Sequence, residues 1–141
     1  MYKKKIKRQK QSIWFVSGSY DKTSFIYDPV SETWSTGPEL SQERFIFCSV
    51  ALNEEKSRVL VAGGRSNSSN GDVTFLDTAW IYDFDTQTHA QTASMNQARF
   101  RMGCAKAKLS GKEVVVVAGG QNDLNVILKT IEVFDIATSA W

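Results

Sequence analysis

The fold is decided by two stretches of the sequence, Val59-Leu60-Val61-Ala62-Gly63-Gly64 and Val115-Val116-Val117-Ala118-Gly119-Gly120. Consecutive aliphatic residues present no polar face, so each stretch predicts a strand that is buried on both sides. Each strand ends at a glycine pair, because glycine reaches positive φ without a Cβ penalty and lets another backbone segment approach closely. A weaker copy, Ile13-Trp14-Phe15-Val16-Ser17-Gly18, stands near the start of the chain. The three copies indicate a repeat of stacked sheets.

Each of the three copies is followed by further characteristic residues, or landmarks, which stand at matching distances from one another. An aromatic–aspartate pair comes next, and a large ring stands seven residues beyond each aromatic residue. An Arg-Phe step stands ten residues beyond the first two of these rings. The period is 55 residues and then 52. The landmarks are Tyr27-Asp28 with Trp34, Tyr82-Asp83 with His89, Phe134-Asp135 with Trp141, and the steps Arg44-Phe45 and Arg99-Phe100.

A glycine pair, an aromatic–aspartate pair and a tryptophan at this period resemble the kelch repeat. The resemblance covers about residues 12–141 and implies an all-β fold, a partial kelch β-propeller of four-stranded antiparallel blades. Residues 12–40 would form a partial first repeat, residues 41–95 the second, and residues 96–141 a truncated third. Residues 1–11 form a basic tail. The aromatic rings and the glycines are interpreted as structural.

We expect strands near residues 13–17, 24–28, 45–52, 58–62, 79–84, 101–108, 113–118 and 130–135, with no helix longer than two turns. The resemblance implies inner strands at Arg44–Leu52 and Arg99–Leu109, and a fourth strand beginning near each tryptophan. The first repeat has no room for an inner strand outside the tail, and the third stops before its outer strand. Propellers close with about 4–8 blades. About three repeats therefore predict open blade faces, and hence self-association or marginal stability.

Charge and cysteine usage limit the function classes. The first ten residues carry six basic groups, whereas residues 11–141 hold 11 basic and 15 acidic groups. A mildly acidic body argues against nucleic acid as a partner. The sequence contains no apolar run long enough to span a membrane and no signal peptide at its start. Cys48 and Cys104 each stand the same number of residues before a glycine pair. We therefore interpret both as free cysteines of the core, which predicts a reduced, cytoplasmic protein.

The sequence offers little catalytic chemistry. His89 is the only histidine and occupies a tryptophan position, so neither a metal site nor a nucleophilic triad is predicted. No phosphate-binding, dinucleotide-binding or HExxH motif occurs. We therefore predict no catalytic residue and no cofactor. A kelch-fold enzyme is the less favoured alternative, and a copper oxidase of this fold would need histidine ligands that the chain lacks.

Binding to another protein is the favoured function, because loops on a rigid β scaffold carry recognition. The distance from Gly18, Gly64 and Gly120 to the aromatic residue that follows each of them is 9, 18 and 14 residues, so the loop between them varies in length. The resemblance implies that Arg101, in Arg99-Phe100-Arg101, lies at the mouth of the channel and binds carboxylates of an acidic peptide. Arg65 and Asn67 resemble a second contact point. The predicted partner-binding residues are Arg65, Ser66, Asn67, Arg101 and Asn122, the alternative being a solvated loop with solvated charges.

The resemblance leaves two binding roles open. One is substrate recognition for a cullin-type ubiquitin ligase, and the other is binding to actin or the cytoskeleton. Residues 1–141 contain no segment that distinguishes them. The basic tail has three interpretations: a nuclear-localisation-type patch, an electrostatic anchor, or a sequence without function at a truncated start. The last is favoured, because the tail stands where an inner strand is expected.

Overall fold

A computed structural model of the chain describes residues 13–15, 22–53, 57–67 and 70–141, of which residues 13–15 are described by their backbone alone. The described residues form twelve strands and no helix, which confirms the all-β prediction. The described part accordingly contains no helix that could cross a membrane. The basic tail predicted at residues 1–11 lies outside the described residues.

Ten strands form three antiparallel sheets, each with its strands in sequence order. Sheet 1 contains β1 (Ile13–Phe15), β2 (Phe25–Asp28) and β3 (Thr33–Thr36). Sheet 2 contains β4 (Cys48–Ala51), β5 (Arg58–Ala62), β8 (Ala79–Asp83) and β9 (Thr88–Gln91). Sheet 3 contains β10 (Gly103–Leu109), β11 (Lys112–Ala118) and β12 (Ile131–Asp135). The other two strands, β6 (Arg65–Asn67) and β7 (Val73–Phe75), form a separate hairpin.

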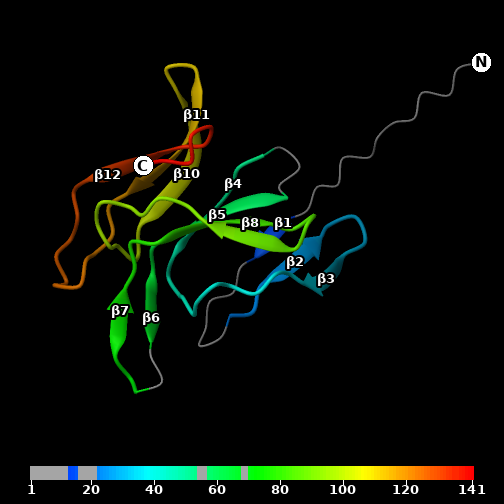
Figure 1. Cartoon of the computed structure of the whole chain (residues 1–141), viewed down its shortest axis with the longest axis horizontal. Coiled ribbons are helices and arrows are strands. Elements are labelled where there is room, and N and C mark those ends of the chain that lie inside the picture. The colour runs from blue at the N-terminus through cyan, green and yellow to red at the C-terminus, as the bar shows by residue number, and fades with distance from the viewer. Residues whose placement is uncertain (1–12, 16–21, 54–56, 68–69) are drawn as a thin grey trace, which may run out of the picture.

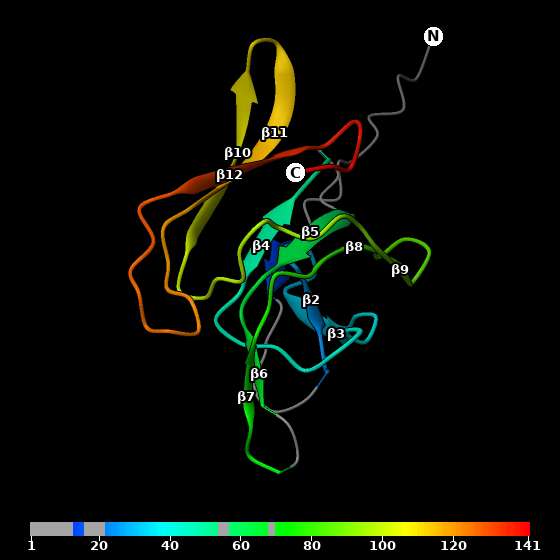
Figure 2. The same cartoon turned by 60° about the vertical axis from the view of Figure 1, so that its left-hand side comes forward.

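The three sheets follow one another in space as they do in the chain (Figures 1 and 2). Alternate residues of β5 point to opposite sides, so Val61 packs toward sheet 1 and Leu60 toward sheet 3. The aliphatic run of β5 is therefore buried on both faces, as the sequence predicts. The two cores are Leu40, Val59, Val61, Tyr82 and Phe84 between sheets 1 and 2, and Cys48, Leu60, Ala62, Val115, Val117 and Phe134 between sheets 2 and 3.

Sheet 2 is the complete four-stranded unit that the resemblance implies. Among the described residues sheet 1 has no inner strand and sheet 3 has no outer strand, as expected from the sequence. The outer strands β3 and β9 carry Trp34 and His89. His89 packs 5.2 Å from the Tyr82 ring, as Trp34 packs 5.0 Å from Tyr27, so it replaces tryptophan in the repeat.

The aspartate of each aromatic–aspartate pair caps the turn that follows it. The Asp83 carboxylate accepts hydrogen bonds from the backbone N–H groups of Asp85 and Thr86. Asp135 accepts from Ala137 and Thr138 in the same way. Lys112 donates a hydrogen bond to Asp135, and together with these backbone donors it lowers the pKa of that carboxyl group. The aspartate of each pair is therefore a structural residue of the turn.

The inner strands begin later than predicted. The predictions placed them at residues 45–52 and 101–108, whereas β4 begins at Cys48 and β10 at Gly103. Ile46 and Arg101 adopt positive φ values of 55° and 57°, which interrupts the extended backbone at equivalent places in the two repeats. Phe45 and Phe100, just before the interruptions, make isolated β-bridges to Arg65 and Gln121.

Each inner segment is hydrogen-bonded to its own sheet by one buried arginine. The buried Arg44 guanidinium donates hydrogen bonds to the backbone carbonyls of Gly63 and Thr78 and to the Thr78 hydroxyl. Arg99 makes the same contacts with Gly119 and Thr130. Burial lowers the pKa of Arg44 to about 10, which leaves it charged at neutral pH. Both arginines are therefore structural residues of their sheets.

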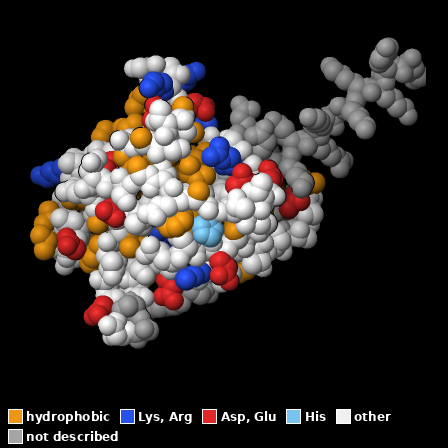
Figure 3. Space-filling view, viewed as in Figure 1, with side chains coloured by type: hydrophobic (Ala, Val, Ile, Leu, Met, Phe, Trp, Pro, Cys, Tyr) orange, Lys and Arg blue, Asp and Glu red, His pale blue; other side chains and the backbone are white. Residues whose placement is uncertain are grey.

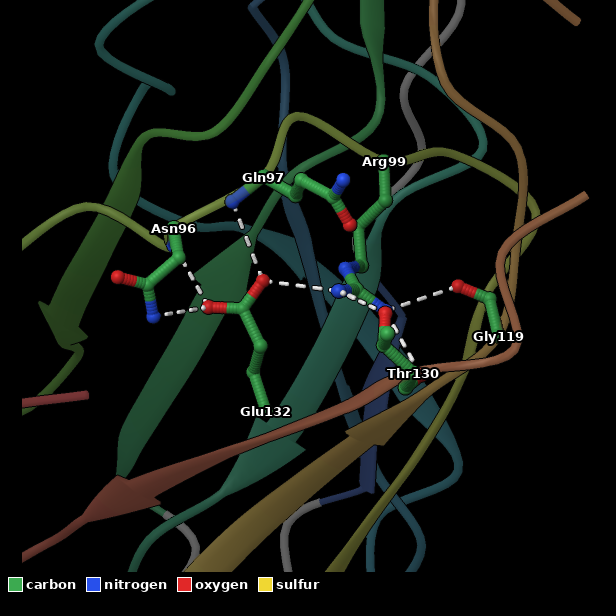
Figure 4. Close-up of polar contacts among 6 residues, drawn as sticks. All are labelled: Asn96, Gln97, Arg99, Gly119, Thr130 and Glu132. Carbon is green, nitrogen blue, oxygen red and sulfur yellow. Dashed lines mark hydrogen bonds and ion pairs between the residues drawn. The ribbon is translucent and has the colours of Figure 1, made fainter. Parts of the chain in front are cut away.

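Arg99 differs from Arg44 by an ion pair that the sequence analysis did not anticipate (Figure 4). The Glu132 carboxylate lies 2.8 Å from the Arg99 guanidinium and is itself buried. Glu132 also accepts hydrogen bonds from the backbone N–H groups of Asn96 and Gln97. Trp80 occupies the corresponding position of sheet 2, so Arg44 has no carboxylate partner there.

The interpretation of Cys48 and Cys104 as free cysteines is wrong. The two residues form a disulfide between β4 and β10, with Cα atoms 6.0 Å apart. In the ladders Cys48 pairs with Ala62, whereas Gly103, not Cys104, pairs with the equivalent Ala118. Counting from the glycine pairs missed this offset of one residue. Because a shift of one residue turns a side chain to the other face, Cys104 points back toward sheet 2 and meets Cys48.

Sheet 3 leaves hydrophobic side chains uncovered. Ile131 is 62% exposed, although Ala79, at the corresponding position of sheet 2, is fully buried. Hydrophobic side chains also gather at the left-hand edge of the space-filling view, over the loop that leads into β12 (Figure 3). This loop contains Leu124, Val126 and Ile127, all of which are exposed.

Candidate functional site

Arg65 lies between two phenylalanine rings at one end of the inner segments. Its guanidinium carbon lies 4.5 Å from the centroid of the Phe45 ring and 5.8 Å from that of Phe100. Its backbone exchanges two hydrogen bonds with Phe45, which fixes the start of β6 beside the inner segment. The Arg65 Nε is buried with no hydrogen-bond partner among the described residues. Stacking on the rings thus holds the arginine and leaves part of its donor set unused.

Arg101 lies beside the same aromatic residue. Its guanidinium carbon is 5.2 Å from the Phe100 centroid, and its side chain is exposed. It donates a 3.3 Å hydrogen bond to the Gln121 carboxamide oxygen. The positive φ of Arg101 interrupts the extended backbone just before β10 begins at Gly103. Arg65 and Arg101 therefore flank one ring, and we call Arg65, Phe100, Arg101 and Gln121 the arginine cluster.

The other predicted site residues divide into two groups. Asn67 lies two residues from Arg65 on β6 and so shares its side of the hairpin, whereas Ser66 points to the opposite side. The Asn67 carboxamide oxygen is buried without a hydrogen-bond partner in the described part of the chain. The Asn122 carboxamide oxygen accepts from the backbone N–H groups of Leu124 and Val126, so Asn122 orders its own loop.

The long loop after Gly64 contains a hairpin, which the expected strands did not include. β6 and β7 pair in antiparallel register from Arg65↔Phe75 to Asn67↔Val73, and the hairpin extends away from the sheets in both cartoon views (Figures 1 and 2). The Phe75 ring lies 5.1 Å from the Phe100 ring. The hairpin is thereby anchored to the arginine cluster.

A polar groove of about 730 Å³ runs beside the hairpin. Its lining includes Phe75 from β7, Asn96 and Gln97 from the segment before Arg99, and Asn122 with Asp123. Phe75 lines the groove and contacts Phe100, so the groove adjoins the arginine cluster. The arrangement offers cationic, amide and aromatic groups along one continuous surface.

The sequence analysis missed the aromatic and amide parts of this cluster. Phe45 and Phe100 were regarded as landmarks of the repeat, yet they are the rings against which Arg65 and Arg101 lie. Gln121 stands where Arg65 stands in the preceding repeat, directly after a glycine pair. The Arg-Phe steps were a usable signal, because they place a ring next to each positive-φ residue.

A second groove lies on the outer side, with a volume of about 680 Å³. Arg58, Asp83 and His89 line it together with β9 and Ser139. No group of three or more histidine, cysteine, aspartate or glutamate residues with metal-binding geometry occurs among the described residues.

Comparison with known proteins decides the family. The Kelch motif matches residues 102–141. Kelch-like protein 24 from rat is 31% identical over 112 residues, which cover 77% of this chain. The chain belongs to the kelch-repeat family. The F-box/kelch-repeat protein At1g26930 from Arabidopsis thaliana is 29% identical over 82% of this chain, and Kelch-like protein 36 from Bos taurus is 28% identical over 86%.

The kelch repeats of this chain also match a solved kelch propeller, the structure of YjhT, with a TM-score of 0.73 at 15% identity. That alignment covers 92% of this chain and 47% of YjhT. Sheets 1, 2 and 3 are therefore blades of a partial kelch propeller, which confirms the predicted fold class. The chain spans 26% of the Arabidopsis relative, 16% of Kelch-like protein 24 and 18% of Kelch-like protein 36.

Proposed function

We propose that the chain is a protein-binding scaffold that takes an acidic peptide segment at the arginine cluster. Kelch-repeat relatives support the coarser role of protein interaction. The observation that carries the finer proposal is the pair of guanidinium groups beside Phe100, one of which has a buried, unpartnered Nε. Arginine binds carboxylates through a planar set of donors.

The surroundings favour an acidic ligand over a basic one. Residues 11–141 carry a net charge of −4, so two arginines at one place form a local positive spot on an acidic body. The adjoining groove, which Asp123 also lines, supplies the Gln97 carboxamide, the Asn96 carboxamide oxygen and the Asn122 amide N–H groups for the backbone of an extended peptide. Aromatic and arginine residues are the side chains enriched in binding hot spots.

Charge reversal tests this proposal. We expect Arg101→Glu to weaken binding of an acidic peptide by about 2 kcal/mol or more, the scale for losing a hot-spot contact. Arg58→Glu is the matched control, because Arg58 is an exposed arginine at the far end of β5 that lines the outer groove. It should leave the affinity unchanged.

The measurement is a fluorescence-anisotropy titration of wild type and both variants with glutamate-rich peptides and their glutamine counterparts. The glutamine peptides should bind wild type more weakly, and added salt should reduce the difference. Equal affinities for all three proteins would remove the arginine cluster as the site. A loss confined to Arg58→Glu would place the site in the outer groove instead.

The most specific part of the proposal concerns the biological role of the chain. Substrate recognition for a cullin-type ubiquitin ligase is the favoured role, with actin or cytoskeletal binding as the alternative. Co-sedimentation with actin filaments that Arg101→Glu leaves intact would favour the alternative. We also propose that the chain is not an enzyme.

A cytoplasmic location is part of the same proposal, although disulfides persist chiefly in oxidising compartments. Alkylation of Cys48 and Cys104 in intact cells, read by mass spectrometry, tests this location together with the disulfide.

A further inference from the structure

The hairpin strand β7 is paired along one edge only. Its residues Val73–Phe75 pair with β6, and these two strands form a sheet of their own. Within the described part of the chain no other strand or bridge pairs with β7, so its outer edge is open. An open edge of this kind accepts an added strand from another chain through main-chain hydrogen bonds.

The hydrogen-bond pattern of the hairpin identifies the backbone groups that this edge presents. In an antiparallel ladder, hydrogen-bonded pairs alternate with pairs whose backbone groups point away from each other. The Leu76 N–H donates across the hairpin to the residue opposite it, so that pair is hydrogen-bonded. The next pair is Arg65 with Phe75, and Arg65 exchanges its backbone hydrogen bonds with Phe45 instead. By this alternation Phe75 and Val73 direct their N–H and C=O groups outward from β7.

The polar groove of about 730 Å³ runs along this open edge. Its lining comprises all three residues of β7 together with residues 96–98, Asn122 and Asp123. The Arg99 N–H donates to the Leu76 carbonyl, which holds the segment of residues 96–98 near the end of β7. The hairpin lies between β5 and β8, and the other lining segments join sheet 2 to sheet 3 and β11 to β12. The groove is therefore built by inner parts of the chain.

The arginine cluster lies at one end of the open edge. Phe75 is the last residue of β7, and its ring lies 5.1 Å from the Phe100 ring that Arg65 and Arg101 flank. Residues directly opposite each other in a ladder share one side of the sheet, so Arg65 and Phe75 do so here. In an added strand, the residue opposite Phe75 extends this row. A carboxylate at that position therefore lies on the side of the hairpin that carries Arg65.

We infer that the partner protein adds an extended segment to β7 as the third strand of the hairpin sheet. The inference rests on the proposed function and supplies its binding mode and register. The backbone of the segment pairs with Val73 and Phe75, and an aspartate or glutamate stands opposite Phe75. An uncharged residue stands opposite Val73, which is 44% exposed, because Asp123 in the groove disfavours a second carboxylate.

A peptide with blocked amides tests this inference without altering the protein. The probe is a seven-residue peptide whose central glutamate is flanked by valine and threonine, which favour strands. N-methylation removes one backbone donor of the peptide at a time. We expect methylation at alternate residues, whose N–H groups face β7, to weaken binding by roughly 3- to 10-fold, the range for one net hydrogen bond. Methylation at the intervening residues should leave the affinity unchanged.

Val73→Pro tests the same edge from the side of the protein. Proline removes the outward N–H of this position, which the pairing with β6 does not use, and should weaken peptide binding by a similar factor. Val73→Thr is the matched control, because it keeps the N–H and a β-branched side chain. It should bind the peptide as wild type does. The backbone amide shifts of β6 verify that Val73→Pro retains the hairpin.

Failure of the inference is distinguishable from failure of the proposed function. Strand addition is overturned, and the acidic site retained, if Arg101→Glu weakens binding while Val73→Pro does not, or if methylation has the same effect at every position. Absence of binding by this peptide and by the glutamate-rich peptides would overturn both. A dimer of the free chain that Val73→Pro dissociates would assign the edge to a second copy and overturn the inference.

Discussion

Arg99→Met is expected to lower the free energy of unfolding by about 3–5 kcal/mol, the range for breaking one side of a buried ion pair. The substitution removes the cation 2.8 Å from Glu132 and leaves that buried carboxylate with neutral donors alone, the backbone N–H groups of Asn96 and Gln97 and the Asn96 carboxamide. It also leaves the carbonyl groups of Gly119 and Thr130 without their side-chain donor. The uncompensated charge dominates the cost, because methionine replaces most of the apolar part of the arginine side chain.

Arg44→Met provides the control, because Arg44 makes the same hydrogen bonds in sheet 2 but has no carboxylate partner among the described residues. It should cost less than Arg99→Met, and the double variant Arg99→Met/Glu132→Gln should recover part of the loss. Chemical denaturation monitored by tryptophan fluorescence measures all three variants. If Arg99→Met cost no more than Arg44→Met, the ion pair would contribute nothing to holding sheet 3.

Reduction of the Cys48–Cys104 disulfide is expected to lower the free energy of unfolding by about 4 kcal/mol, which the chain-entropy estimate gives for a loop of this length. The two cysteines are 56 residues apart in sequence and join the inner strands of sheets 2 and 3. Opening the bond frees that loop in the unfolded chain. The contact between the two sheets then depends on packing and on hydrogen bonds such as that from Lys106 to the Leu52 carbonyl.

The matched control is Cys48→Ala/Cys104→Ala, measured with and without reductant. Reductant should lower the unfolding midpoint of wild type and leave that of the double variant unchanged. Mass spectrometry after alkylation should find no free thiol in the oxidised wild type. Two free thiols, or a wild-type midpoint that reductant does not move, would exclude the disulfide.

The sequence predicted the repeating unit well, because its landmarks have local physical causes. Consecutive aliphatic residues present no polar face, so they form buried strands. An aspartate after an aromatic residue caps the turn that directly follows it, which requires no distant contact. Residues of the two repeats could not be matched by sequence distance alone where the distance between two of these landmarks differs by one residue between the repeats. The ladder offset between Cys48 and Cys104 is such a case, since the repeat measured from the glycine pairs differs from the repeat measured from the Arg-Phe steps.

The candidate site was only partly predictable. Arg65 and Arg101 were singled out from the sequence, and the structure places both beside Phe100. The role of Gln121 depends on its β-bridge to Phe100 and on its hydrogen bond with Arg101, 20 residues earlier, which no local pattern reveals. Asn122 was predicted as a contact residue, yet its carboxamide oxygen caps its own loop. Such contacts follow from tertiary packing and not from residue spacing.

Binding of an acidic peptide at the arginine cluster is tested by titrating isotope-labelled protein with a glutamate-rich peptide and mapping backbone amide shifts by NMR. We predict that the largest shifts occur at Arg65, Arg101 and Gln121, with smaller shifts along the groove that includes Phe75 and Asn122. Shifts centred on Arg58 and His89 in the outer groove, or no saturable shift at all, would contradict this account.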